Sequence, residues 1–289
     1  MDALAEPKKY YRVAFYGSAF GPELDGVTFV YRFGNTVGLL DCVDIVKQKV
    51  KEVLGSADKA ELLPSNKKVE NLDLSKNYVQ VVSVLPHWSR DEQQRRLSSP
   101  ALQNLGLMHF LQQIPFTKNP KHAFSSHLDE QWMKKVVSVT SSHFSFAPSR
   151  IRILYEETDH LSPIQMCESM IYDRVMSVKQ ALVNQEQTSY IPLLMILQGS
   201  LMMTPDTGPY EMMKLFLEGA NAEKHSQEHV RKLATILKQF ALVLKPALDI
   251  VEAHALTSSP QTLPLIEELK KSYVHFEATL NSYPVMQHS

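Results

Sequence analysis

The alternation of apolar and polar residues divides the chain into two halves with different periods. In the first half, short segments rich in valine, tyrosine and phenylalanine predict β-strands. In residues 150–156 (RIRILYE) the two kinds of residue alternate cleanly, as expected of a half-buried strand. An Asp-Gly pair at 25–26 predicts a turn between the first two strands. The predicted strands are residues 10–16, 27–33, 78–85, 133–146 and 150–156.

One helix is predicted inside the strand-rich half. Asp41 precedes the segment CVDIVKQKVKEVL and Gly55 follows it, so we expect one helix with a cap at each end. The polar segment 87–100 (HWSRDEQQRRLSSP) predicts an exposed loop or a short helix. Its arginines, Arg90, Arg95 and Arg96, are expected on a solvated face.

The second half predicts long amphipathic helices. Ser162 and Gln165 form a capping box, with Pro163 at the first helical position. Three apolar stripes follow at steps of three or four residues, and Pro246 is expected to kink or split the second helix. A shorter helix is predicted between Pro209 and Gly219. The stripes are Ile164, Cys167, Ile171, Val175, Val178 and Leu182; Val230, Leu233, Leu237, Phe240, Leu244, Leu248 and Val251; and Ile266, Leu269, Tyr273, Phe276 and Leu280.

Amphipathic helices of this length bury their stripes against one another, which is the logic of a helical bundle. We therefore expect an α+β fold with two lobes. Residues 1–158 form an antiparallel β-sheet lobe, and residues 159–289 form an antiparallel α-helical bundle.

Composition narrows the classes of function. Of the 289 residues, 44% are hydrophobic and 21% are charged, and the formal net charge is −1. This balance gives no reason to expect a nucleic-acid partner. The two cysteines, Cys42 and Cys167, lie on apolar helical faces far apart in the sequence and are expected to be inert packing in a reducing compartment. The chain has no signal-peptide pattern and no apolar run of membrane-spanning length, so a cytoplasmic location is expected.

Motifs of covalent catalysis are absent, and no cofactor is expected. The sequence contains no GxGxxG, GxxxxGK[ST] or GxSxG pattern. One pattern, HSQEH at 225–229, has the spacing of a zinc-peptidase class, in which His225 and His229 bind the metal and Glu228 orients a water. Such a site needs a further acidic ligand, and spacing selects none of Glu252, Glu267, Glu268 and Glu277. We favour an ordinary polar helix start, with a zinc hydrolase as the remote alternative.

A break interrupts the helical pattern at residues 197–209 (LQGSLMMTPDTGP), where Asp206 is the one charged residue. Two explanations compete. Leu201, Met202 and Met203 either pack under the bundle or are exposed as a functional loop. The residues alone favour packing, because apolar side chains usually lie inside.

An ordered set of segments resembles the catalytic region of the DOCK family of guanine-nucleotide exchange factors, known as the DOCKER domain or second Dock homology region. The segments are KYYRVAFYG…LDGVTFVYR (9–32), YVQVVSVLP (78–86), IPFT (114–117), LDEQWMKKVVSVTSSHFSF…RIRIL (128–154), LSPI (161–164), QGS…GP (198–209) and HVRKLATILKQF (229–240). Their order and spacing hold over nearly the whole chain.

The resemblance implies the family's lobes B and C, a middle lobe of two antiparallel sheets and a C-terminal four-helix bundle. The family's N-terminal dimerising lobe has no counterpart here, so no dimerisation through it is expected. The implied partner is the nucleotide-free form of a Rac-like or Cdc42-like Rho-family GTPase, with no direct membrane insertion. Recruitment to a membrane would come through other domains or partners.

The resemblance also implies site residues. In the family, a loop that interrupts a bundle helix expels magnesium from the GTPase with a valine at its tip, and Pro205 takes the valine position here. The nucleotide-release loop would comprise Leu201, Met202, Met203, Thr204, Pro205 and Asp206. Partner-binding positions would be Gln198, Gly199, Ser200, Thr207, Gly208, Pro115, Phe116, Leu161, Ser162 and Pro163. The proline leaves an alternative open, in which the fold binds a GTPase as a scaffold without exchange activity.

Overall fold

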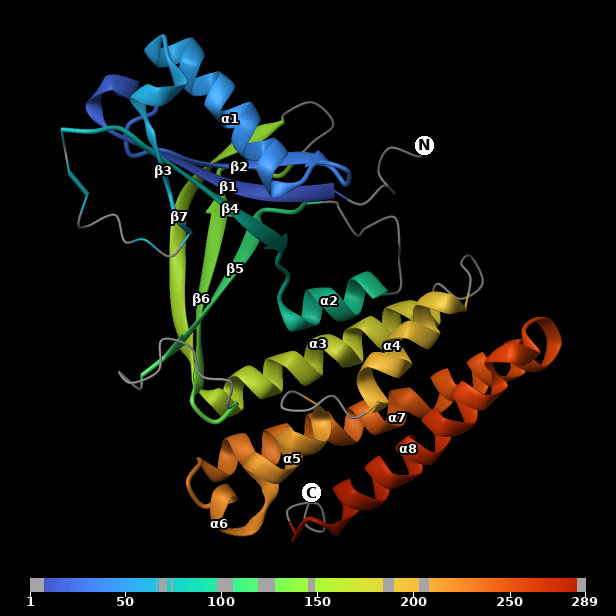
Figure 1. Ribbon diagram of the computed structural model, residues 1–289. Helices are drawn as coiled ribbons and strands as arrows, with labels where there is room; N and C mark the ends of the chain where they lie inside the picture. Colours follow the sequence, from blue (N-terminus) through green and yellow to red (C-terminus); the bar gives the residue numbers. More distant parts are fainter. Residues whose placement is uncertain are drawn as a thin grey trace. The chain divides into compact units, whose positions relative to one another are not determined.

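The computed structural model divides the chain into two compact units (Figure 1). Unit 1 comprises residues Met1–Ile114 and Lys134–Asp159, and unit 2 comprises Pro115–Met133 and His160–Ser289. The segment 115–133 was expected in the sheet lobe by its position in the sequence, yet it clusters with the helices. The structure describes residues 8–65, 67, 72–73, 75–97, 106–118, 128–144, 149–183, 190–202 and 208–284.

The strands form one sheet that closes on itself. Its order is β1-β2-β7-β6-β5-β4-β3, and β1 also pairs with β4, so six strands complete a ring and β3 lies outside it. The pairings of β1 with β2 and β4, of β2 with β7 and of β4 with β5 are antiparallel, and β3 runs parallel to β4. The strands are β1 (Lys8–Tyr16), β2 (Thr28–Gly34), β3 (Glu61–Leu63), β4 (Tyr78–Pro86), β5 (His109–Thr117), β6 (Gln131–Thr140) and β7 (Arg150–Leu161).

The α+β fold class is confirmed, with corrections to single elements. A single closed sheet replaces the two sheets that the resemblance implied. The strand predicted over 133–146 ends at Thr140, whose hydroxyl donates to the Ser142 carbonyl at 2.8 Å and so turns the chain. The last strand runs to Leu161, beyond the predicted end at 156. β3 and β5 were missed because their apolar and polar residues do not alternate.

Helix α1 (Leu39–Leu54) covers the core that β1 and β4 share. Its N-cap is Gly38 rather than Asp41, which stands at the third helical position and accepts the Gly38 backbone N–H at 2.6 Å. Gly55 ends the helix as predicted, with φ of 79° in the left-handed region that favours glycine. Cys42, Val46 and Val50 face inward at adjacent turns.

Helix α2 (Arg90–Leu97) occupies the polar segment. The prediction that all three of its arginines are solvated is wrong for Arg96. That side chain is 13% exposed, lies 3.5 Å from the centre of the Trp88 ring and pairs with Glu92 at 2.7 Å. A cation on an aromatic face is stabilised by the ring quadrupole, so Arg96 holds α2 against the end of β4.

Unit 2 is a helical bundle (Figure 1). One of the two bonds of the predicted capping box forms, because the Ser162 backbone N–H donates to Gln165 Oε1 at 2.9 Å; the Ser162 hydroxyl donates to the same oxygen at 2.9 Å. The predicted stripes are buried and constitute one core, except that Leu182 is only partly buried. The helices are α3 (Pro163–Val183), α4 (Ile191–Leu201), α5 (Pro209–Leu217), α6 (Gly219–Ala222), α7 (Gln227–Ser258) and α8 (Leu263–Ser282); short 3₁₀ turns lie at Ser18–Phe20, Ala57–Lys59 and Pro260–Thr262.

Pro246 does not split α7, which is helical from Gln227 to Ser258. Proline removes one N–H and crowds the carbonyl four residues earlier, here that of Leu242. Pro246 and Leu242 are both exposed, so water can bind the freed carbonyl. Among the described residues, no helix is long and apolar enough to cross a bilayer.

An ion pair between the buried Arg12 and the more exposed Glu156 links four strands of unit 1. Arg12 of β1 donates to both carboxylate oxygens of Glu156 on β7, at 2.6 and 3.1 Å. It also donates to Gln80 on β4 at 3.2 Å, and Ser138 on β6 donates to Glu156 at 2.8 Å. Burial alone would raise the pKa of Glu156, but the hydrogen bond and charge of Arg12, with help from Ser138 and Lys134, lower it.

We expect Arg12→Met to lower the free energy of unfolding by about 2–3 kcal/mol, because it leaves a partly buried carboxylate without its cation. The folded pKa of Glu156 is depressed, so the pair's contribution is complete above its ordinary value of 4.5 and disappears as pH falls through the lower folded value. Urea unfolding at pH 7 and pH 3 measures both effects. Lys76→Met, which breaks an exposed pair with Glu61, is the control and should leave the midpoint unchanged. Equal losses in both variants would contradict this account.

Both cysteines are buried, and burial raises the pKa of Cys42 and of Cys167 to about 12. Because the thiolate is the reactive form, neither should react with DTNB at pH 8 in the folded protein, and both should react in denaturant. Rapid modification of either thiol without denaturant would contradict the packing described here.

Candidate functional site

The break between α4 and α5 is shorter than the sequence suggested. The last turn of α4 consists of Gln198, Gly199, Ser200 and Leu201. Met202 is the C-cap, and its backbone N–H donates to the Gln198 carbonyl at 3.0 Å. Helix α5 begins at Pro209, with Gly208 as N-cap. The positions between these ends, Met203, Thr204, Pro205, Asp206 and Thr207, lie outside the described residues.

Both ends of the break are fixed in the bundle core. Leu201 is 1% exposed, and Ser200 before it is also buried. Gly208 and Pro209 are buried on the other side. Leu201 follows Leu197 by one helical turn and therefore lies on the same inward face, so the expectation that it belongs to an exposed loop is wrong. Packing was the correct explanation for Leu201, and Met202 packs partly against the same core.

The two glycines beside the break, Gly199 and Gly208, do not adopt a left-handed backbone conformation. Gly199 is helical, and Gly208 has φ of −78°, which any residue adopts. Gly199 is exposed and has open space where a side chain would lie. Its effect is therefore to leave the backbone of α4 bare at this point of the surface.

A second group of predicted residues is brought together by the ends of three strands. The Phe116 ring of β5 lies 5.7 Å from His160 of β7 and 6.4 Å from Trp132 of β6. The Lys118 ammonium lies 3.1 Å from the centre of the Trp132 ring. His160 directly precedes Leu161, so two segments predicted to bind a partner, around Phe116 and Leu161, are neighbours.

Exposure differs among these predicted residues. Pro115 is exposed, and Phe116, Leu161 and Ser162 are half-buried. Pro163 is buried at the start of α3, so it supports the helix and presents no surface of its own. Three residues of this group were not predicted from the sequence: Trp132, Lys118 and His160. The chain has only two tryptophans, and a tryptophan in a half-buried strand was a signal that could have pointed to them.

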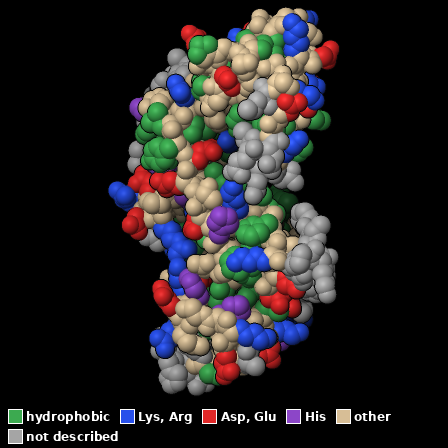
Figure 2. Space-filling view, turned by 90° about the vertical axis from the view of Figure 1, so that its left-hand side faces the viewer, with side chains coloured by type: hydrophobic (Ala, Val, Ile, Leu, Met, Phe, Trp, Pro, Cys, Tyr) green, Lys and Arg blue, Asp and Glu red, His purple; other side chains and the backbone are tan. Residues whose placement is uncertain are grey.

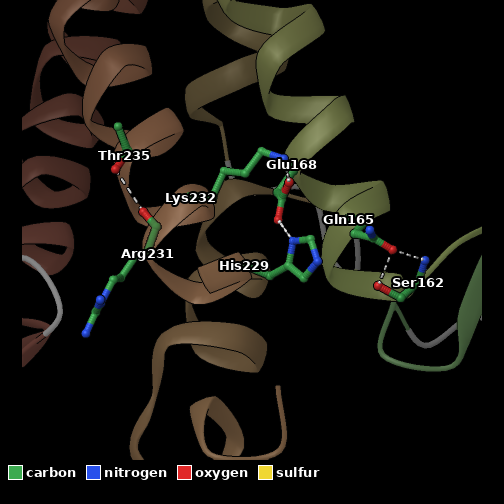
Figure 3. Close-up of polar contacts among 7 residues, drawn as sticks. All are labelled: Ser162, Gln165, Glu168, His229, Arg231, Lys232 and Thr235. Carbon is green, nitrogen blue, oxygen red and sulfur yellow. Dashed lines mark hydrogen bonds and ion pairs between the residues drawn. The ribbon is translucent and has the colours of Figure 1, made fainter. Parts of the chain in front are cut away.

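Glu168 of α3 is a buried carboxylate at 2% exposure that bonds to two residues of α7 (Figure 3). His229 Nδ1 lies 2.7 Å from Oε1, and Lys232 Nζ lies 3.1 Å from Oε2. An ionised carboxylate only accepts hydrogen bonds, so His229 donates through Nδ1. The contact satisfies a charge inside the bundle and fixes α3 against the first turns of α7.

This contact changes the interpretation of the HSQEH pattern. His229 is turned toward Glu168, whereas His225 precedes the helix and packs on Phe216 with ring centres 5.0 Å apart. Burial, aided by Lys224 and opposed by Asp129, lowers the pKa of His225. In the described part of the chain, no three His, Cys, Asp or Glu side chains are placed to hold a metal ion. His229 thus lies in the first turn of α7, where it contacts α3 through Glu168.

Charges of both signs are mixed on the face of the molecule that Figure 2 shows. In Figure 2, histidine side chains lie beside lysine and arginine side chains on one face of the molecule, mixed with acidic and hydrophobic groups. This agrees with the net charge of −1. This face therefore does not favour recognition of a partner through net charge. Its shape and its apolar contacts are more informative about a partner.

The architecture defines a class: a closed antiparallel sheet followed by a bundle with one briefly interrupted helical segment. Comparison with protein families agrees with it. The family description "DHR-2, Lobe B" matches residues 65–143, and "DHR-2, Lobe C" matches residues 178–283. The chain belongs to the DOCK family and carries lobes B and C of its DHR-2 region.

Individual relatives extend the match over most of the chain. Human dedicator of cytokinesis protein 8 is 28% identical over 266 residues, covering 91% of this chain, and mouse dedicator of cytokinesis protein 6 is 28% identical over 273 residues, covering 94%. Guanine nucleotide exchange factor SPIKE 1 of Arabidopsis thaliana is 28% identical over 255 residues, covering 83%. The chain spans 12%, 13% and 14% of the lengths of these three relatives.

We expect His229→Leu to lower the free energy of unfolding by about 1–3 kcal/mol, because it leaves the buried Glu168 carboxylate with one partially exposed partner. Adding Glu168→Gln should recover part of this loss, and a double-mutant cycle by urea unfolding measures the coupling.

Arg231→Ala is the matched control for this cycle. Arg231 is exposed on the same turn of α7, and its side chain takes no part in the Glu168 contact (Figure 3). Its removal should leave the unfolding midpoint unchanged. Strictly additive effects of the His229 and Glu168 changes would show that the contact stabilises nothing.

Proposed function

We propose that this chain is the catalytic part of a guanine-nucleotide exchange factor for a Rho-family GTPase. One observation supports the proposal in addition to family membership. A short segment without Lys or Arg is flanked on both sides by buried residues. Leu201 and Pro209 are both in the bundle core. The buried flanking residues support a role in which the loop between them presses on a partner.

The proposed chemistry is the removal of magnesium from the GTPase. The ion is the largest local charge at a nucleotide phosphate site, so its loss unbalances the bound nucleotide. Magnesium requires near-ideal octahedral oxygen geometry and retains several waters. The side chains of Met203 and Pro205 offer it no oxygen ligand and would leave no room for those waters. The exchange factor thereby acts without covalent chemistry and without a cofactor of its own.

The partner is the nucleotide-free GTPase, Rac-like or Cdc42-like. Two described groups of residues are proposed to bind it. One is the surface next to the break, with Gln198 and Gly199, both of which are exposed. The other is the aromatic group around Phe116 with Leu161 and Ser162. We also propose that the protein acts in the cytoplasm and reaches membranes through other segments or partners.

A second function is favoured by Pro205. Proline fixes its own φ and lacks an N–H, so the loop could follow a different path from one with valine. The chain would then bind a nucleotide-free GTPase as a scaffold and leave the nucleotide release rate unchanged.

Release of a fluorescent guanine nucleotide from a panel of Rho-type GTPases separates the two functions. We expect acceleration of one member, and replacement of residues 203–206 by Gly and Ser should reduce the acceleration at least about tenfold, equivalent to about 1.4 kcal/mol. Leu201, Met202 and Pro209 are retained, so the bundle stays intact.

Binding of the nucleotide-free GTPase is the control, and the loop variant should retain it. Pro205→Val tests the departure from the family and should exchange at least as fast as the wild type. Full exchange activity in the Gly/Ser variant would contradict the loop mechanism. Stable binding with no acceleration in the wild type would establish the scaffold instead.

A further inference from the structure

The contact between α3 and α7 holds a histidine in a defined orientation at the surface of unit 2 (Figure 3). Nδ1 of His229 lies 2.7 Å from Oε1 of Glu168, whose side chain is only 3% exposed. The imidazole is 25% exposed, so one edge of the ring is fixed in the bundle and another part meets solvent. The hydrogen bond made by one ring nitrogen decides which nitrogen carries the proton, so Glu168 sets the state of the exposed part.

The charges around Glu168 determine which hydrogen-bonding group His229 offers. Lys232 Nζ lies 3.1 Å from Oε2 of Glu168, so an ammonium already balances the carboxylate and the imidazole need not carry a charge. A neutral imidazole has one N–H donor and one acceptor nitrogen. Because Nδ1 donates to Glu168, Nε2 is left as the acceptor, and within the described part of the chain no residue donates to it.

This acceptor lies beside a residue that the proposed function places in the GTPase interface, Ser162. At the start of α3, Ser162, Gln165 and Glu168 follow at steps of three, which makes them neighbours on the helix surface. Ser162 donates to Gln165 at 2.9 Å, and Figure 3 shows the second ring nitrogen of His229 on the side where this pair lies. Ser162, Gln165 and His229 are each half-buried, so a partner can reach them.

We propose that His229 is a specificity-determining residue for the GTPase, and that its Nε2 accepts a hydrogen bond from an uncharged donor of that partner, a hydroxyl or a backbone N–H. This rests on the proposed function. A cationic donor is disfavoured, because the Lys232 ammonium is bound to the same carboxylate and like charges at an interface oppose binding. A partner without a donor leaves the acceptor desolvated and unpaired, which a site built for a hydrogen bond rejects strongly.

Glu168 acts through His229 as a positioning residue. As a carboxylate it only accepts hydrogen bonds, so it keeps the ring proton on Nδ1. A glutamine at this position can donate its amide N–H to Nδ1 and let the proton move to Nε2, which turns the outward acceptor into a donor. The buried charge of Glu168 thereby has a consequence at the surface, in addition to fixing α3 against α7.

The state of the ring is measured first, by ¹⁵N NMR of the histidine side chains in the free whole chain at pH 8. We expect a neutral His229 protonated at Nδ1, with its signals assigned by their absence from His229→Asn. In Glu168→Gln, a population protonated at Nε2 should appear. A doubly protonated ring, or a proton on Nε2 in the wild type, overturns the inference independently of any GTPase.

Binding to the nucleotide-free GTPases of the same panel then separates the outward contact from the inward one. Asparagine places its amide nitrogen near the position of Nδ1, so His229→Asn keeps a donor for Glu168 and loses the outward acceptor. We expect its unfolding midpoint to be nearly kept and its dissociation constant to rise about tenfold, as for the loss of one hydrogen bond. The longer glutamine reaches the position of Nε2 instead, so His229→Gln should lose stability and retain more of the binding.

His275→Asn is the matched control. It makes the same change at an exposed histidine of α8 that stacks on Tyr210, with ring centres 5.4 Å apart. It should bind the GTPase as the wild type does.

The outcomes distinguish this inference from the proposed function. Unchanged binding by His229→Asn, in a protein whose wild type binds and exchanges, overturns the inference and leaves the function intact. Binding losses in His229→Asn and His229→Gln that follow only their losses of stability would assign His229 a structural role and overturn the inference as well. A wild type that binds none of the GTPases overturns the proposed function and this inference with it.

Discussion

Unit 2 depends on the burial of the apolar stripe of α7. This helix runs from Gln227 to Ser258, and buried residues recur on one face of it from Val230 to Ala255. It packs against α3, α4, α5 and α8, and a single core joins them. No helix can hide such a stripe alone, so the other helices take positions that α7 defines. Where a buried carboxylate of α3 meets this core, a histidine and a lysine of α7 satisfy it, which fixes the two helices at one register.

The same packing of the bundle core fixes the residues on either side of the break between α4 and α5. Leu201 enters the core one turn after Leu197, and Pro209 restarts the chain as a buried residue. The packing that stabilises the bundle therefore also fixes both ends of the segment. Stability and the proposed function here use the same residues, and a change that loosens Leu201 would affect both.

Unit 1 is subject to a different constraint. A sheet exposes unpaired backbone N–H and C=O groups at its edges unless it closes. β1 pairs on both sides, with β2 and with β4, and thereby joins the two ends of the ring. The Arg12–Glu156 pair crosses from β1 to β7, with Gln80 and Ser138 as further partners. A charge network inside a sheet is stabilising only when each member is satisfied, and here Arg12 and Glu156 share several hydrogen bonds.

The sequence by itself determined the class of fold and the faces of the long helices, because periods of two and of three to four residues are local properties of the chain. It also located the break near residue 200 and the contact between Ser162 and Gln165 at the start of α3. Tertiary structure decided where the helix before the break ends, that segment 115–133 joins the helices, and that Phe116 meets His160. It also decided that a glutamate on α3 is buried. Glu168 and His229 are 61 positions apart and Arg12 and Glu156 are 144 apart, and no local pattern encodes which distant charges will meet once the apolar surfaces have packed.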